Sequence, residues 1–274
     1  MTWSWSPGPV LIAGPCALEG DDVNLPIADA LAELQTQLGL RVLYKGSFDK
    51  ANRSTADAPR GPGLEPGLRA LERVRSDSGL PVLTDVHEPA QAPVAAGVVD
   101  AIQVPAFLCR QTDLLGAAGA SGLPINIKKG QWMAPEGMVG AVDKVRRGGS
   151  AEIAVTERGT FFGYGDLVVD IRAIPRLQAA TRVPVLFDAT HAVQRPGCGL
   201  GGSSGGDRAF VAPLLRAAAA AGADGFFLET HPRPEHAPSD QATMLPLATL
   251  RELLIPILDI WHVVHDGATA PLDV

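Results

Sequence analysis

The stretch PVLTDV, residues 81–86, places a short apolar run directly before a carboxylate. Leu83 and Asp85 share one face of such a strand because side chains alternate across it. An apolar strand that ends in a polar group is typical of a parallel sheet with chemistry at its carboxyl edge. Comparable runs of Val, Ile and Leu recur along the chain at 10–13, 41–45, 101–105, 124–129, 152–158, 184–190 and 225–230.

Amphipathic stretches separate these runs. In residues 25–40, 64–77 and 208–222 the apolar side chains recur at three and four positions, which is helical spacing. A glycine follows several helical stretches and precedes the next strand, as helix-ending glycines do; these are Gly39, Gly79, Gly122 and Gly222. Strand-helix alternation repeated eight times predicts a (β/α)8 TIM barrel, with a doubly wound open sheet as the alternative.

Composition indicates a single globular domain. Hydrophobic residues make up 46% of the 274, without a composition break, so we expect one catalytic domain over residues 1–274 with its barrel core at about 10–265. The net charge of −7, without basic runs, argues against a nucleic-acid partner. No apolar run reaches the roughly 18 residues of a membrane helix. Three cysteines without framework spacing favour reduced thiols and a cytoplasmic protein.

Polar residues gather where the predicted strands end. They are Lys45, Asp85 with His87, Gln103, Lys128, Arg158, Asp188 with His191, and Glu229 with His231. The carboxyl ends of barrel strands meet at one rim, where active sites lie, so we expect a site there. Asn126 and Lys128 share a face opposite Ile125 and Ile127, and therefore Lys128 should point to the site.

Four residues around this rim form a candidate metal group. Cys16 follows the first predicted strand and His191 follows the seventh. Glu229 lies in the eighth predicted strand, and Asp240 comes after that strand. Barrel closure places these strands side by side, and a thiolate, an imidazole and two carboxylates suit Fe²⁺, Zn²⁺ or Mn²⁺. From spacing alone, a buried structural thiol is the better interpretation of Cys16.

A family resemblance emerges from longer motifs. FDKANRS (48–54), TDVHEPAQ (84–91), AFLCRQTDL (106–114), NIKKGQ (126–131), FDATHAVQRPG (187–197) and SGGDR (204–208) together resemble the 3-deoxy-D-manno-octulosonate 8-phosphate (KDO8P) synthases. The resemblance runs from about Ile12 to about His265. It implies condensation of phosphoenolpyruvate with D-arabinose 5-phosphate and water, giving KDO8P and phosphate on the way to lipopolysaccharide. It also implies a cytoplasmic homotetramer of barrels.

The resemblance also implies roles for individual residues. Cys16 stands where metal-independent relatives carry Asn, so the chain is similar to the metal-dependent kind, with Cys16, His191, Glu229 and Asp240 as ligands. The phosphoenolpyruvate residues would be Lys45, Lys50, Gln103, Lys128 and Arg158. The sugar-phosphate residues would be Asn52, Arg53, Ser54 and, reaching into a neighbouring subunit, Arg110. The catalytic group would comprise Lys50, Lys128, His191, Asp240, Asp85 and His87, although Asp85 and His87 are equally well read as a structural pair.

Two other functions stay open. A DAHP-type synthase would use erythrose 4-phosphate, but its phosphate motif is typically KPRTSP rather than KANRS. A sugar-phosphate binding protein without turnover would share the barrel but lack part of the metal or phosphoenolpyruvate set. We also expect the glycine-rich loop 197–206 to act as a mobile lid. A partner surface is expected at the apolar residues around Arg110, which are Phe107, Leu108, Leu114 and Leu115.

Overall fold

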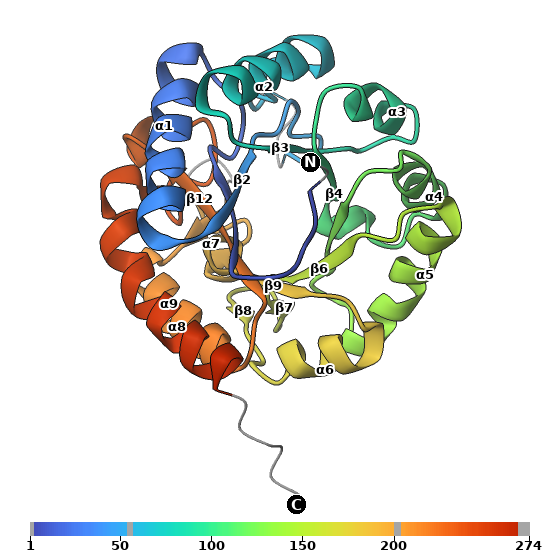
Figure 1. Ribbon diagram of the computed structural model, residues 1–274, viewed down its shortest axis with the longest axis vertical. Coiled ribbons are helices and arrows are strands. Elements are labelled where there is room, and N and C mark those ends of the chain that lie inside the picture. The colour runs from blue at the N-terminus through green and yellow to red at the C-terminus, as the bar shows by residue number, and fades with distance from the viewer. Residues whose placement is uncertain (1–2, 54–56, 200–203, 268–274) are drawn as a thin grey trace, which may run out of the picture.

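Eight parallel strands close into a barrel in the computed structural model, which describes residues 3–53, 57–199 and 204–267 (Figure 1). The strands follow chain order around the barrel and coincide with the eight predicted runs. They are β1 (Val10–Gly14), β2 (Arg41–Lys45), β3 (Val82–Asp85), β4 (Ala101–Val104), β5 (Ile125–Lys128), β6 (Ile153–Glu157), β9 (Val185–Asp188) and β12 (Gly225–His231). The first and last strands pair in parallel, with Val10 opposite Gly225 and Gly14 opposite Glu229. This closure confirms the barrel and excludes the open sheet.

Helices form the outer ring (Figure 1). They are α1 (Asp21–Leu38), α2 (Leu64–Ser78), α3 (Gln91–Ala96), α4 (Thr112–Ala120), α5 (Val139–Gly148), α6 (Ala173–Thr181), α8 (Val211–Ala220) and α9 (Leu250–Asp266). Gly39 and Gly79 follow α1 and α2 with φ of 65° and 70°, the left-handed conformation that glycine adopts without a steric penalty. Short helical turns occupy several loops: α7 (Ala189–Ala192), η1 (Ala106–Leu108), η2 (Pro135–Met138), η4 (Arg208–Phe210), η5 (Pro234–His236) and η6 (Leu247–Thr249).

Short strands decorate the carboxyl end of the barrel. β7 (Thr160–Phe161) pairs with β8 (Leu167–Val168) in a hairpin after β6. β10 (Gln194–Arg195) pairs with β11 (Gly205–Gly206), so these two strands hold together the base of the glycine-rich loop. β13 (Leu245–Pro246) runs beside the end of β12. The alternation pattern of the sequence did not predict these additions.

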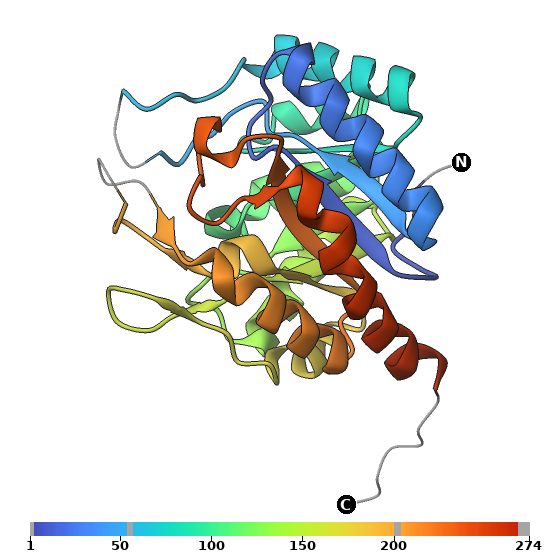
Figure 2. The same cartoon turned by 90° about the vertical axis from the view of Figure 1, so that its left-hand side faces the viewer.

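The amino-terminal segment plugs the opposite end of the barrel. Trp3 and Trp5 are buried against inward-facing residues of the strands, including Val10 and Leu43. The Arg41 guanidinium lies 4.6 Å from the Trp3 ring centroid, a cation–π contact that holds the plug in place. Figure 2 shows the segment that leads into β1 at the end of the barrel away from the loops that follow β2, β6 and β9. Access to the barrel interior is therefore from the carboxyl rim.

Within the described residues, no helix has the length and apolar character needed to cross a membrane.

Candidate active site

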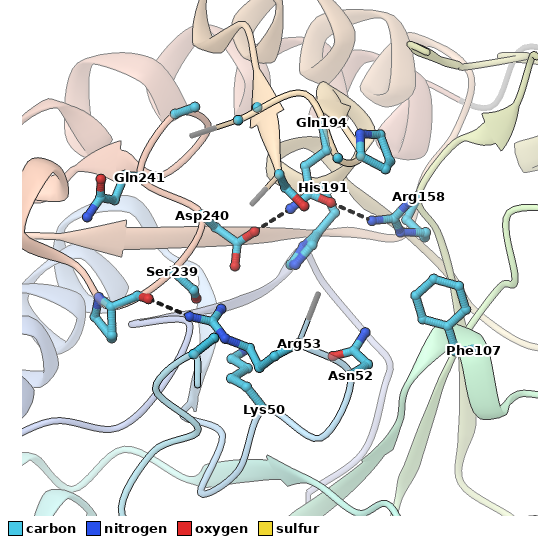
Figure 3. Close-up of a pocket in the computed structure, with 18 of the residues that line it drawn as sticks. Lys50, Asn52, Arg53, Phe107, Arg158, His191, Gln194, Ser239, Asp240 and Gln241 are labelled. Atoms are coloured by element: carbon cyan, nitrogen blue, oxygen red, sulfur yellow. Dashed lines mark hydrogen bonds between the residues drawn. The ribbon is translucent and has the colours of Figure 1, made fainter. Parts of the chain in front are cut away.

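The polar residues predicted at the strand ends gather inside the barrel mouth. Each is at most 6% exposed, which places charged groups in a low-dielectric setting; the set is Lys45, Asp85, Gln103, Lys128, Arg158, Asp188 and Glu229. Above them opens a cavity of about 920 Å³. Figure 3 shows Lys50, Arg53, Arg158, His191 and Asp240 converging on it from different loops.

A chain of hydrogen bonds runs around the barrel interior from β2 to β6. The Ser47 hydroxyl and the Gln103 amide both donate to the carboxylate of Asp85. Asn126 donates to Gln103 Oε1 over 2.8 Å, and Thr156 donates to Asn126 Oδ1 over 2.7 Å. Each side chain fixes the orientation of the next, so Gln103 is held in one amide orientation.

Lys45 lies at the start of this chain. Its ammonium donates to Ser47 Oγ over 2.6 Å and to the Cys16 carbonyl over 3.0 Å, and lies 3.4 Å from Asp85 Oδ2. Burial alone would raise the pKa of Asp85, but Lys45 and Lys50 hold it well below its usual range. Asp85 is therefore a carboxylate that orients Lys45.

His87 stands beside Asp85 at the edge of the site. Its ring packs edge-on against Phe48, with ring centroids 5.9 Å apart. Burial lowers the pKa of His87, which outweighs the opposing effect of Asp85. The imidazole is therefore neutral at pH 7, and its buried Nδ1 makes no hydrogen bond to any described residue.

The two adjacent lysines at the end of β5, Lys128 and Lys129, point in opposite directions, as alternation predicts. Lys128 points into the barrel, pairs with Asp188, and lies 3.3 Å from the Phe227 ring centroid. Burial lowers the pKa of Lys128 although Asp188 opposes this. Lys129 points outward and lies 3.5 Å from Glu157 Oε2.

Asp188 also orients His191. Its Oδ2 lies 2.7 Å from His191 Nδ1, and its Oδ1 accepts from the His191 backbone N–H over 2.9 Å. An imidazole that donates from Nδ1 to Asp188 can offer the lone pair of Nε2 to a cation. That nitrogen lies 3.5 Å from Glu229 Oε1, which has no hydrogen-bond partner among the described residues. Two electron-pair donors that face each other in this way suit a shared cation.

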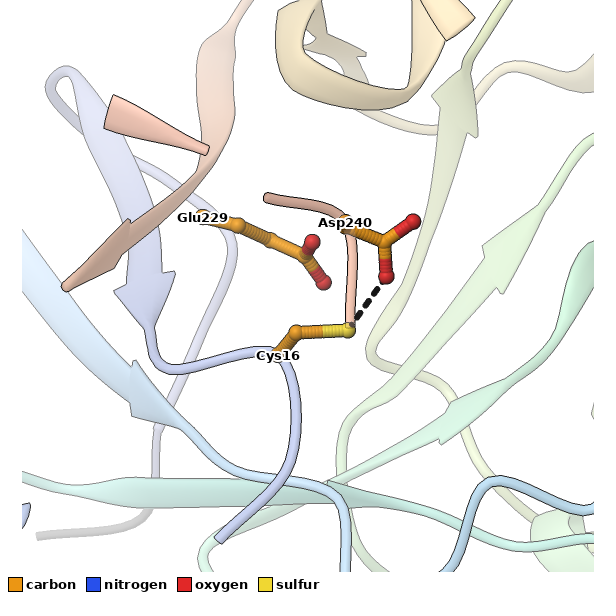
Figure 4. A group of neighbouring side chains, drawn as sticks. All are labelled: Cys16, Glu229 and Asp240. Atoms are coloured by element: carbon orange, nitrogen blue, oxygen red, sulfur yellow. Dashed lines mark hydrogen bonds between the residues drawn. The ribbon is translucent and has the colours of Figure 1, made fainter. Parts of the chain in front are cut away.

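Cys16, Glu229 and Asp240 form a compact group of metal-ligand atoms. One such atom from each lies within 4.8 Å of those of the other two (Figure 4). Cys16 Sγ lies 2.8 Å from Asp240 Oδ2 and accepts from the Ser239 hydroxyl at the same distance. Burial, Asp240 and Glu229 raise the pKa of the Cys16 thiol well above its usual value, so without a cation it is protonated. The residues present fit a divalent ion, which would replace that proton.

Asp240 has an unusual backbone conformation. Its φ of 55° lies in the left-handed region, which is uncommon for residues other than glycine and often marks functional positions. Its carbonyl accepts from the backbone N–H groups of Thr243 and Met244 over 3.0 and 2.9 Å. Burial alone would raise the pKa of Asp240, but His191 and Lys50 lower it to about 2.

The loop after β2 supplies cations to the cavity wall. Lys50, Asn52 and Arg53 line the cavity, and Arg53 donates to the Pro238 carbonyl over 2.8 Å. Burial alone would lower the pKa of Lys50, but Cys16, Glu229 and other acids raise it above its usual value. Ser54 lies outside the described residues. Arg110 is exposed and does not line the cavity.

Sequence reasoning missed several residues of the site. Gln194 accepts from Arg158 over 3.0 Å and donates to Asp240 Oδ1 over 2.5 Å, so it links two predicted site residues. Arg208 lines the cavity and donates to the Gln241 carbonyl over 2.7 Å. Gln194 is uncharged and lies beyond the predicted strand, so alternation gave no reason to select it. Both residues fall within quoted motifs, Gln194 in FDATHAVQRPG and Arg208 in SGGDR, and this was the available signal.

The sequence that forms this site also matches a known protein family. The profile that describes the DAHP synthetase I family matches residues 7–260. The chain belongs to this family.

Several known proteins resemble the chain over most of its length. The 2-dehydro-3-deoxyphosphooctonate aldolase of Nitratidesulfovibrio vulgaris is 54% identical over 255 residues, which cover 93% of each chain. The protein of the same name from Syntrophotalea carbinolica is 54% identical over 250 residues, 91% of this chain and 90% of that protein. A third, from Magnetococcus marinus, is 53% identical over 244 residues, 89% of this chain and 84% of that protein.

Proposed function

We propose that this chain condenses phosphoenolpyruvate with D-arabinose 5-phosphate and water, yielding KDO8P and inorganic phosphate. The observation that carries the proposal is a cavity lined by cations that borders a group of metal-ligand atoms. Lys50, Arg53 and Arg158 supply positive charge to the cavity wall. Asp240 also lines the cavity, and ligand atoms of Cys16 and Glu229 lie within 4.8 Å of its own ligand atom. Relatives at 53–54% identity that are named 2-dehydro-3-deoxyphosphooctonate aldolase support it further.

The deeper part of the site would bind phosphoenolpyruvate. This substrate carries a phosphate and a carboxylate, which require several cations and directed donors close together. The proposed residues are Lys45, Lys50, Gln103, Lys128 and Arg158. Their positions support this role. Lys45, Gln103, Lys128 and Arg158 are buried at the barrel mouth, where little water solvates them, so a bound anion would serve as their hydrogen-bond partner.

The outer part of the site would bind the sugar phosphate. Asn52 and Arg53 line the cavity wall, and a guanidinium suits a phosphate that is gripped by two parallel hydrogen bonds. We assign Ser54 to the same phosphate as the next residue of the loop. Arg110 is exposed after β4, and we propose that it completes the sugar-phosphate site of a neighbouring subunit in a cytoplasmic homotetramer.

A divalent ion would bind to Cys16, His191, Glu229 and Asp240. The thiol, the imidazole and the carboxylates suit Fe²⁺, Zn²⁺ or Mn²⁺. Such an ion would supply Lewis-acid chemistry that orients or activates water and the sugar aldehyde. The chain itself contributes Asp188, which orients the His191 ring, and Ser239, which donates to the Cys16 sulfur.

The reaction would form a C–C bond and a C–O bond and break one C–O bond. C3 of phosphoenolpyruvate attacks the aldehyde carbon, water adds at C2, and phosphate leaves from C2 as the C2 hydroxyl becomes a keto group. The added water loses both of its protons, one to the former aldehyde oxygen and one to the departing phosphate. The groups that we propose for these transfers are Lys50, Lys128, His191, Asp240 and His87. Asp85 would act through Lys45 by holding the ammonium in place.

Phosphate release tests the proposal. The protein is incubated with phosphoenolpyruvate and, in turn, arabinose 5-phosphate, ribose 5-phosphate and erythrose 4-phosphate, with and without a chelator. We expect phosphate only with phosphoenolpyruvate and arabinose 5-phosphate, and loss of turnover on chelation that added divalent ion restores. Faster turnover with erythrose 4-phosphate would instead identify a DAHP synthase. Binding of the sugar phosphate without any turnover would indicate a binding protein.

A further inference from the structure

The amide of Gln194 joins the cationic half of the site to the metal-ligand half. Its Oε1 accepts from Arg158 over 3.0 Å, and its Nε2 donates to Asp240 Oδ1 over 2.5 Å (Figure 3). The residue as a whole is 6% exposed, so water has little access to these bonds. A flipped amide would present a donor to the guanidinium and an acceptor to the carboxylate, and both contacts would become repulsive. The orientation of Gln194 is therefore fixed by its two partners.

The two oxygens of Asp240 have different partners. Oδ1 takes the Gln194 hydrogen bond, whereas Oδ2 faces the Cys16 sulfur at 2.8 Å. The oxygen on the side of the candidate ligands is thus the one that Gln194 leaves free. An ion bound to Oδ2 would therefore stabilise the carboxylate orientation in which Oδ1 accepts the hydrogen bond from Gln194.

The backbone reinforces this link. Gln194 pairs with Gly206 in the β10–β11 ladder. A Cβ on Gly206 would come within 2.2 Å of Thr243 Cγ2, so the ladder packs directly against the turn that follows Asp240. The backbone N–H of Thr243 in turn donates to the Asp240 carbonyl over 3.0 Å. Gln194 and Asp240 therefore belong to one packed unit.

We infer that Gln194 is a positioning residue that couples the binding of a divalent ion at Asp240 to the binding of phosphoenolpyruvate at Arg158. The inference rests on the proposed function. Arg158 Nη1 is buried without a hydrogen-bond partner among the described residues, so this arginine retains a donor for an anion. Because the three side chains are already bonded to one another, a ligand that restricts the motion of Arg158 or Asp240 also restricts the other, and the second ligand then loses less conformational entropy on binding.

Such coupling is reciprocal and can be measured from both sides. Isothermal titration calorimetry gives the Kd of Mn²⁺ with and without saturating phosphoenolpyruvate, and the Kd of phosphoenolpyruvate with and without Mn²⁺. For the parent protein we expect each ligand to tighten the other by at least roughly 5-fold, the lower end of common coupling strengths. Part of this factor comes from direct attraction between the ion and the anion, which does not depend on Gln194.

The test compares Gln194→Ala and Gln194→Met with the parent. Met keeps the length of the side chain but has no amide, so it decides the matter if Ala impairs folding. In both variants we expect the coupling factor to fall at least about 3-fold while each ligand still binds alone. Gln178→Ala is the matched control, because that amide also links two groups: its Nε2 donates to Gly222 O and to Asp224 Oδ2, beside the start of β12. It should retain the parental factor.

The possible failures are distinct. A coupling factor in Gln194→Met within twofold of the parental value would overturn the inference and leave the proposed function intact. A parent protein that binds Mn²⁺ but no phosphoenolpyruvate would overturn the proposed function and this inference together. A decrease of equal size in Gln178→Ala would mean that loss of packing, rather than the bridge, causes the effect, and would also overturn the inference.

Discussion

Nδ1 of His191 lies 2.7 Å from Oδ2 of Asp188, and the same carboxylate neutralises Lys128. One buried acid therefore sets both the tautomer of a candidate ligand and the position of a candidate substrate cation. Burial alone would raise the pKa of Asp188, but His191 and Lys128 hold it far below its usual range. Substitution of Asp188 should therefore affect both the orientation of His191 and the position of Lys128.

Asp188→Asn should weaken divalent-ion binding by about 10–100-fold, the usual cost of losing such a supporting hydrogen bond. The amide keeps the shape of the side chain but removes the charge that favours Nδ1–H. Competition with a fluorescent chelator measures the affinity. Asp170→Asn, which alters a surface acid paired with Arg172, is the control. Equal affinities in the parent and Asp188→Asn would remove Asp188 from this role.

Cys16→Asn should lose bound metal. The sulfur lies 2.8 Å from Asp240 Oδ2, and an amide is a much poorer ligand for a borderline ion than a thiolate. Elemental analysis of the purified protein gives the metal content. Cys198→Ser is the control because Cys198 is exposed and belongs to no ligand group among the described residues. Unchanged metal content in Cys16→Asn would contradict the assignment.

Arg53→Ala should lower the affinity for arabinose 5-phosphate by roughly 10–150-fold and leave the affinity for phosphoenolpyruvate unchanged. A charge-assisted hydrogen bond contributes about 1.5–3 kcal/mol, and each 1.4 kcal/mol corresponds to about tenfold in affinity. Separate titrations of the two substrates check this. Arg60→Ala removes a nearby exposed arginine that pairs with Asp49, and it should change neither affinity. Equal weakening of both substrates by Arg53→Ala would mean that the residue serves the whole site.

Acid should destabilise the fold partly through Asp85. Its pKa is lower in the folded protein than in the unfolded chain, so its contribution is complete above about pH 4 and is lost as the pH falls toward the folded pKa. A single such proton contributes a slope of up to about 1.4 kcal/mol per pH unit. Urea unfolding between pH 4 and pH 2 should therefore show a shallower pH dependence for Asp85→Asn. Identical slopes would mean that Asp85 has no depressed pKa.

Mixing defective chains tests whether Arg110 acts across an interface. Arg110→Ala and Lys128→Ala chains are dissociated, mixed and reassociated, and native mass spectrometry verifies mixed oligomers. If Arg110 serves a neighbouring subunit, some mixed sites contain both groups, and activity rises above the sum of the two parents. If Arg110 serves its own barrel, every site stays defective. No recovery in verified mixed oligomers would therefore refute a shared site.

The sequence predicted the barrel and most of the buried site because both depend on local alternation. An apolar strand that ends in Lys45, Asp85 or Lys128 specifies which side chains enter the barrel mouth before any neighbour is known. The order of strands around the barrel then follows chain order, so the site residues come together without further information.

The parts that could not be predicted depend on contacts between distant segments. Gln194 is important because Arg158 and Asp240 lie on either side of it, and neither neighbour can be read from local sequence. The predicted apolar patch shows a similar limit. Leu114 and Leu115 are buried in the core, so that part of the prediction is wrong, whereas Phe107 is exposed and stacks near Trp132. A short helix such as α4 does not reveal which of its apolar residues face inward.

The pairing of β1 with β12 also constrains when the metal group can exist. Residues 10–14 pair with residues 225–229. Cys16 is synthesised long before Glu229 and Asp240, so the three ligands cannot come together until residue 240 has left the ribosome. Contacts between segments so far apart in sequence form late in folding. A nascent chain therefore cannot trap an ion with this set of ligands. The amount of bound metal would then measure the fraction of molecules in which β12 has paired with β1.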